Sequence, residues 1–202
     1  MASLLPLFPL DVVLFPGTPL PLHIFEPRYK EMIGECLAQS APFGVIRAVE
    51  QGVEAIGCTA EIVTVTKKYA DGRLDIVTEG RKRFELLQLN QELNYLRGEV
   101  MLLEDEPIAP LKEETERAVR LHADILSLAG AVQDLSGANQ GMLSFYLAGS
   151  IPLDLDFKQK LLGLGSESQR ISALAEYLES VLPNLRRGAR AREKASGNGH
   201  AR

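Results

Sequence analysis

Cysteine and histidine are scarce in this sequence. Its 202 residues include two cysteines, Cys36 and Cys58, and three histidines, His23, His122 and His200. Two isolated thiols indicate neither a disulfide scaffold nor a zinc site, and three scattered histidines lack the spacing of metal ligands. We therefore predict no metal, no cofactor and a cytoplasmic protein, with Cys36 as a core thiol on the apolar face of a helix.

Motifs for nucleotide hydrolysis and nucleophilic catalysis are absent from the sequence. None of the 17 glycines is followed by lysine, which excludes a phosphate-binding P-loop. The patterns H-E-x-x-H, G-x-S-x-G and S-x-x-K do not occur either. We predict that the chain has no catalytic residues and is not an enzyme. The alternative is a hydrolase in which the fold brings a carboxylate to His23.

Basic residues are missing from the first 27 positions, although residues 4–28 are rich in apolar side chains and contain six prolines. A secretion signal would need a cationic segment before its apolar run. A membrane-spanning helix would need about 20 apolar residues without so many helix-breaking prolines. We interpret LLPLF, VVLF and LPLHIF as strands of a buried sheet, separated by a turn at Phe15-Pro16-Gly17, and expect no membrane association.

Charge is distributed unevenly along the chain. The 17 residues from Arg186 onward contain six Lys or Arg and one acidic residue, whereas the first 185 contain 16 Lys or Arg and 26 acidic residues. An acidic body argues against nucleic-acid binding by the fold itself. The tail is rich in Gly, Ala and Arg and has no apolar period, so we expect residues 186–202 to be disordered.

Residue periodicity changes from β-like to helical along the sequence. Pro27 starts a helix with an apolar face that continues to about residue 39, and β-rich segments fill residues 43–103, with Asp71-Gly72 marking a hairpin. An acidic, proline-marked break at 104–110 precedes helices at 111–129, 138–148 and 154–163, the last capped by Asp154. A capping box at Ser166 starts a final helix that we expect to end at Pro183.

The sequence also resembles a known family. The segment PLFPLDVVLFPGTPLPLHIFEPRYKEM, followed by GCTAEI, DGRLDIVTEGRKRFEL, RGEV and IPLDLDFKQKLL, is similar to the N-terminal substrate-binding domain of the Lon ATP-dependent proteases over roughly residues 4–182. The resemblance implies an α+β fold, with a PUA-like β pseudo-barrel and a packed helix followed by a C-terminal helical bundle. We expect a β-rich region at 1–106, a helical region at 107–185 and the tail at 186–202.

The resemblance is to the standalone bacterial form of this domain, without the ATPase and peptidase domains of the proteases, so a protease label would follow from the family name alone. It implies a non-catalytic module that binds unfolded or hydrophobic polypeptide segments as an adaptor or regulator of proteolysis. The expected partners are such segments, a protease or a second copy of the chain. The alternative is a PUA-like RNA-binding protein assisted by its basic tail.

The family signature supplies the candidate peptide-binding residues, and each also has a structural interpretation. Arg28 is able to pair with Glu26, Phe25 and Tyr29 are expected in the core, and His23 is expected to be a strand residue bonded to backbone. We place His122 at the rim of its helix. The candidate peptide-binding residues are Phe15, Pro16, His23, Phe25, Arg28 and Tyr29.

Overall fold

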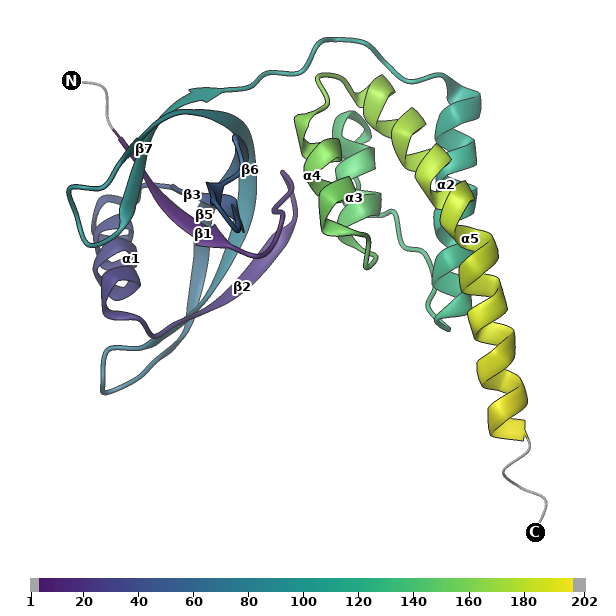
Figure 1. Cartoon of the computed structure of the whole chain (residues 1–202), viewed down its shortest axis with the longest axis horizontal. Coiled ribbons are helices and arrows are strands. Elements are labelled where there is room, and N and C mark those ends of the chain that lie inside the picture. Colours follow the sequence, from purple (N-terminus) through teal and green to yellow (C-terminus); the bar gives the residue numbers. More distant parts are fainter. Residues whose placement is uncertain (1–3, 198–202) are drawn as a thin grey trace. The chain divides into compact units, whose positions relative to one another are not determined.

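The computed structural model describes residues 4–197 and contains two compact units (Figure 1). The β unit consists of residues 4–105 and 152–163, and the helical unit of residues 106–151 and 164–197. The segment 152–163, which the sequence placed in the helical region, therefore belongs to the β unit. None of the helices in the described part is long and apolar enough to cross a membrane.

The β unit is built around a small closed barrel. Strand β1 pairs with β7 on one side and, in parallel, with β3 on the other, so that β1, β7, β6, β5 and β3 form a ring. Strand β2 pairs with the first part of β6, from Leu74 to Glu79. The elements are β1 (Leu5–Leu10), β2 (Pro19–Ile24), α1 (Pro27–Gln39), β3 (Phe43–Val49), β4 (Gly52–Val53), β5 (Ile56–Lys68), β6 (Leu74–Asn90) and β7 (Leu96–Leu102).

Glycines allow large side chains to fill one face of these strands. A Cβ atom on Gly57 would lie 2.5 Å from Cζ of Phe84, and one on Gly98 would lie 2.5 Å from Cδ1 of Leu86. Real Cβ atoms do not approach other atoms so closely, because cores are packed to crystal density. Phe84 and Leu7, both fully buried, occupy the space that these glycines leave.

Helix α1 covers the other large cluster of the β unit (Figure 1). Pro27 occupies its first turn, as predicted, where the missing N–H costs nothing. Its face of Tyr29, Met32, Ile33 and Cys36 is buried, and the Tyr29 ring lies 4.1 Å from the ring of Phe8. The helical period of the sequence therefore identified this face correctly.

The predicted strand at Val12–Phe15 is wrong, because this segment is irregular. Thr18 bonds the carbonyl of Phe15 through both its backbone N–H (3.2 Å) and its hydroxyl (2.8 Å), which closes a turn where the strand would continue. Phe15 and Leu14 are nonetheless buried. The predicted Asp71-Gly72 hairpin is confirmed between β5 and β6.

Helix α4 (Leu155–Gly163) belongs to the β unit because polar contacts tie it to the strands. Arg83 donates 2.7 Å to the carbonyl of Leu162, and Gln159 donates 2.9 Å to the carbonyl of Ile56. The predicted N-cap is confirmed, since Oδ1 of Asp154 accepts from the backbone N–H groups of the two residues that follow Leu155.

The helical unit pairs two long helices. It contains α2 (Lys112–Leu128), a short 3₁₀ turn η1 (Gln140–Met142), α3 (Leu143–Gly149) and α5 (Glu167–Gly197). The predicted apolar face of α5 is buried at Ile171, Leu174, Ala175, Leu178 and Leu182.

Helix α5 does not end at Pro183, and the expectation of a disordered tail is wrong as far as Gly197. Arg, Ala, Lys and Glu, which dominate this segment, are strong helix formers, so a helix already held by buried Leu178 and Leu182 extends through them. Residues 198–202, including His200, lie outside the described part of the chain.

His122 is buried in the helical unit, with 1 % of its surface exposed, so the expected rim position is wrong. Its Nε2 lies 2.7 Å from Oγ of Ser150, and Nε2 of Gln133 lies 2.8 Å from its Nδ1. The Gln133 amide is a donor, so Nδ1 must accept and the imidazole must be neutral. Burial lowers the pKa of His122 accordingly.

Candidate functional site

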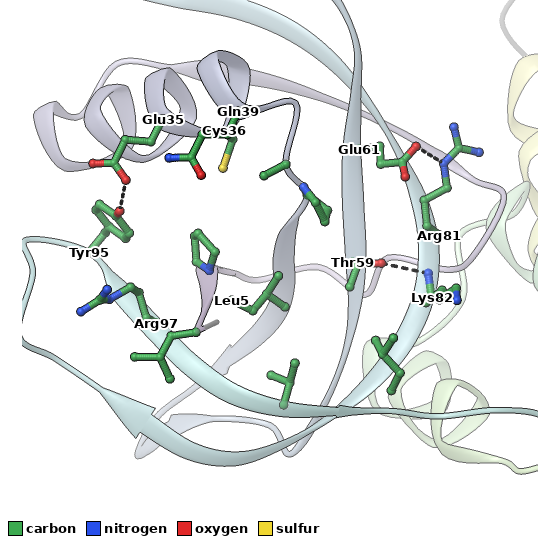
Figure 2. A pocket seen from close by; sticks show the side chains of 16 residues that line it. Leu5, Glu35, Cys36, Gln39, Thr59, Glu61, Arg81, Lys82, Tyr95 and Arg97 are labelled. Carbon is green, nitrogen blue, oxygen red and sulfur yellow. Dashed lines mark hydrogen bonds and ion pairs between the residues drawn. The ribbon is translucent and has the colours of Figure 1, made fainter. Parts of the chain in front are cut away.

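A pocket of about 840 Å³ opens in the β unit. Helix α1 and strands β1, β5, β6 and β7 all contribute to it, and Figure 2 shows Leu5 between Glu35 and Tyr95 on one side and Thr59 and Lys82 on the other. The volume of this pocket is within the range of small-ligand sites, and the pocket has room for several side chains. The apolar part of the lining comes from Leu4, Leu5, Pro6, Ala41, Pro42, Val100 and Leu102.

Two carboxylates at the pocket already have partners. Tyr95 donates 2.7 Å to Glu35, and Arg81 donates 2.8 Å to Glu61 (Figure 2). Burial, together with the hydrogen bond to Glu35, raises the pKa of Tyr95 to about 12, so the phenol remains protonated and keeps donating. The acceptors of the pocket are therefore largely occupied.

Lys82 and Arg97 also line the pocket and differ in their partners. Among the described residues, no carboxylate lies within 4.0 Å of the Lys82 ammonium. Arg97 contacts Asn90 at 3.3 Å and Glu92 at 3.5 Å, while its buried Nε has no hydrogen-bond partner in the described part. The pocket thus combines an apolar lining with donors that are not fully used.

The thiol at the pocket, Cys36, is buried. Burial, with a smaller contribution from Glu35, raises the pKa of Cys36 to about 11, so the reactive thiolate is scarce at neutral pH. Cys58 is buried as well, and burial raises its pKa to about 12. Within residues 4–197, no three His, Cys, Asp or Glu side chains are grouped to hold a metal ion.

None of the six peptide-binding candidates from the sequence lines this pocket. Phe15, Pro16 and Tyr29 are buried, so a partner would not reach them without rearrangement of the core. Arg28 is exposed and pairs with Glu26 at 2.9 Å, as the structural interpretation predicted. The pocket residues come from six separate segments, which explains why sequence motifs did not reveal them.

Phe25 is 58 % exposed, so its expected core position is wrong. Alternation along β2 gives the reason, because Leu20, Leu22 and Ile24 face inward and His23 faces outward. Phe25 follows His23 by two residues and continues the outward row. This alternation was present in the sequence and would have placed Phe25 correctly.

His23 meets a carboxylate, as the hydrolase alternative requires. Its Nδ1 lies 2.5 Å from Oδ1 of Asp75, whose Oδ2 accepts a 2.9 Å bond from Tyr69. The hydrogen bond from His23 and, to a smaller extent, the bond from Tyr69 hold the pKa of Asp75 below its usual range. The expected backbone partner of His23 is therefore wrong. In the described part, no Ser, Thr or Cys side chain hydrogen-bonds His23.

These features define an α+β domain with a closed β-barrel and an apolar pocket. Residues 4–180 match the family model of the ATP-dependent protease La (LON) substrate-binding domain. The chain belongs to this family.

Known relatives agree with this assignment. The chain is 30 % identical over 185 residues to a Lon protease of Parabacteroides distasonis, covering 82 % of this chain and 22 % of that protein. It is 25 % identical over 193 residues to Lon protease 1 of Hydrogenovibrio crunogenus, covering 87 % and 23 %. The chain therefore spans less than a quarter of the length of these curated relatives.

Solved structures show the same fold. A Lon N-terminal domain protein from Xanthomonas campestris aligns with a TM-score of 0.72 and 26 % identity, over 87 % of this chain and 98 % of that one. The N-terminal domain of a Mycobacterium avium complex Lon protease aligns with a TM-score of 0.67 and 18 % identity, over 88 % and 98 %. The predicted α+β, PUA-like fold is confirmed.

Proposed function

We propose that the β unit binds unfolded polypeptide by accepting its apolar side chains in the pocket of Figure 2. The observation that carries the proposal is the pocket itself, an open apolar site in a chain of a substrate-binding family. Transfer of one Leu or Phe side chain from water into such a site contributes about 1.5–3 kcal/mol. Two or three anchors would therefore be enough for weak binding.

The unpaired edge of β2 offers few backbone donors, which favours recognition through side chains over strand addition. Gly80 donates to the carbonyl of Thr18, and alternation along the ladder then turns the backbone of Pro19 and Pro21 toward the free edge. Proline has no N–H, so an added strand would find few donors there. This edge argues against binding by strand addition.

The second part of β5, residues 61–68, is protected against strand addition in a different way. In the described part, residues beyond Ala60 pair only with β6, which leaves the opposite edge open. Two register shifts interrupt this stretch, and it ends in Lys67 and Lys68. Bulges and lysines both discourage pairing with a further strand. A client would thus contact the β unit through its side chains.

Affinity for any one segment should be modest. An unfolded client loses conformational entropy when it binds, which offsets several kcal/mol of the contact energy. We expect dissociation constants in the micromolar range or weaker, about −8 kcal/mol or less negative. Weak, side-chain-based contacts suit a module that meets many different sequences.

We also propose the wider role that the sequence suggested. In this role the protein is cytoplasmic and non-catalytic. It acts as an adaptor or regulator of proteolysis, and its partner is a protease or a second copy of the chain. The missing P-loop and S-x-x-K patterns in the sequence support a non-catalytic role. The RNA-binding alternative has less support, because one tail arginine, Arg186, already pairs with Asp124 at 2.7 Å.

A matched pair of variants tests the proposal. Leu102 and Met101 are neighbours on β7 and are both 48 % exposed, yet only Leu102 lines the pocket. We expect Leu102→Glu to weaken binding of a permanently unfolded, carboxymethylated protein about tenfold or more, because a charge replaces an apolar contact. Met101→Glu should have little effect.

The measurement is fluorescence anisotropy with the labelled client, with its native form as a second ligand. Native client should not bind. Equal losses in the two variants, or equal binding of native and unfolded client, would refute the pocket as the site.

A further inference from the structure

A second exposed surface of the β unit gathers aromatic rings outside the pocket. The Phe25 ring stacks on His23 with centroids 5.8 Å apart and 23° between the planes, and Tyr69 meets His23 edge-on at 5.8 Å. We call His23, Phe25, Tyr69 and the cations Lys67 and Arg73 the Phe25 surface. Phe25 is 58 % exposed at the centre of this cluster.

Cations lie against these rings. Nζ of Lys67 lies 4.5 Å from the centroid of Tyr69, and Cζ of Arg73 lies 4.7 Å from it. Lys68 follows in the chain but pairs with Leu74 on the other face of β5, whereas Lys30 donates 3.0 Å to the carbonyl of Asp71. In the described part, none of the three lysines has a carboxylate within 4.0 Å.

The acidic side chains of this region already have partners of their own. Asp75 is held by His23 and Tyr69, and Asp71 pairs with Arg73 at 2.7 Å. The surface therefore presents unpaired ammonium groups around an apolar ring, while its carboxylates are internally satisfied. Such a surface is complementary to carboxylates that flank a large apolar side chain.

We propose that the Phe25 surface is a second contact for polypeptide and selects segments in which Asp or Glu flanks an aromatic or large aliphatic residue. The inference rests on the proposed function, since it adds a charge preference to a polypeptide-binding module. The client's apolar side chain packs on Phe25, and its carboxylates bond Lys67 and Lys30. Its range of clients would then be biased toward acidic unfolded segments.

A polypeptide fits this surface better than single-stranded nucleic acid. Bases need open ring faces for stacking, but cations already lie over the Tyr69 ring. The remainder of the chain to residue 185 is also acidic and repels a phosphate backbone. Carboxylates on a short segment need only the local ammonium groups.

The test uses two labelled 16-residue peptides with the same apolar residues, one with Glu and Asp and the other with Gln and Asn in their place, and a 16-nucleotide oligo(U). We expect the acidic peptide to bind about fivefold or more tightly than the amide peptide in low salt, with the difference shrinking as salt is added. Equal affinities, or tighter binding of oligo(U), would overturn the proposal.

Variants separate this surface from the pocket. Phe25→Ser, and Lys67→Glu combined with Lys30→Glu, should each remove most of the preference for the acidic peptide. Val63→Ser is the control for the first, because Val63 lies on the same sheet and is 56 % exposed. Lys112→Glu, an exposed change in the helical unit, is the control for charge.

The two proposals fail separately in this design. Leu102→Glu should weaken both peptides equally, and its failure to do so would refute the pocket alone. An unchanged acidic preference in Phe25→Ser and in the double lysine variant would refute the Phe25 surface alone. Lys67→Gln with Lys30→Gln provides a milder pair should the reversed charges alter folding, which circular dichroism would reveal.

Discussion

Two charged clusters, one in each unit, are built in opposite ways. In the β unit, the Arg81–Glu61 pair and the Lys82 ammonium stay exposed beside an apolar pocket. In the helical unit, Arg170 and Glu167 are buried and bond each other at 2.9 Å. The first arrangement leaves groups available to a partner, whereas the second uses its charges to hold its own helices together. Binding is therefore expected in the β unit and stability in the helical unit.

The largest expected effect follows from breaking the buried ion pair. Arg170 is fully buried and bonds Glu167, the Ser144 hydroxyl and the Leu164 carbonyl, with its guanidinium 4.4 Å from the Phe145 ring. Arg170→Met leaves the Glu167 carboxylate buried without its cation, which costs about 3–5 kcal/mol. Urea unfolding should show this loss.

A surface arginine is the control for that prediction. Arg117 bonds Glu114 and Glu179 on the exposed side of the helical unit. Arg117→Met should lower stability far less, because exposed pairs are screened by water and salt. Similar urea midpoints for the two variants would show that burial of the Arg170 pair has no special weight.

The next effect concerns packing in the β unit. Gly57→Ala places a methyl group 2.5 Å from Phe84 and 2.6 Å from the carbonyl of Val45, which is backbone and has little freedom to move. Such overpacking typically costs ~1–3 kcal/mol. Gly34→Ala in α1 has open space and should instead stabilise by ~0.5–1 kcal/mol. Thermal unfolding should therefore move in opposite directions for the two variants.

The smallest effect is a pH dependence of the helical unit. Burial lowers the folded-state pKa of His122, so the unfolded chain binds the proton more tightly than the folded chain. The neutral imidazole is favourable above about pH 6.5, and stability falls as the pH drops below that value toward the lowered pKa. We expect the melting temperature to fall more between pH 7.5 and 5.5 in the wild type than in His122→Gln. An identical decrease in both proteins would contradict a neutral imidazole that is hydrogen-bonded at both ring nitrogens.

Local patterns in the sequence were sufficient for much of the fold. The helical period identified the buried face of α1, Asp71-Gly72 identified the β5–β6 hairpin, and Asp154 identified the start of α4. Each of these features depends on residues within a few positions of one another. Propensity and capping therefore suffice to predict them.

Features that depend on distant contacts were missed. The attachment of α4 to the strands rests on Arg83 and Gln159, which meet carbonyl groups far away in the sequence. His122 is buried through Ser150 and Gln133, and no local pattern marks it as a core residue. The extension of α5 past Pro183 shows in the same way that a packed helix overrides a local breaker.

The pocket was not predicted from the sequence, and the binding role of the signature residues stays a prediction. Of the signature residues, His23, Phe25 and Arg28 are exposed as a binding role requires, but the pocket residues were not foreseen. Phe25 would have been placed correctly by the two-residue period of β2. The pocket would not, because Leu5, Lys82 and Leu102 come together only when the strands close into a ring.

Amide chemical-shift mapping of the full chain with an unlabelled, carboxymethylated client tests the central claim most directly. We expect the largest amide shift changes at the pocket residues Leu5, Arg97 and Leu102, and smaller ones at Phe25. The amide shifts of the buried face of α5 should not change. Shifts concentrated on α2 and α5, with the pocket amides unmoved, would contradict this claim.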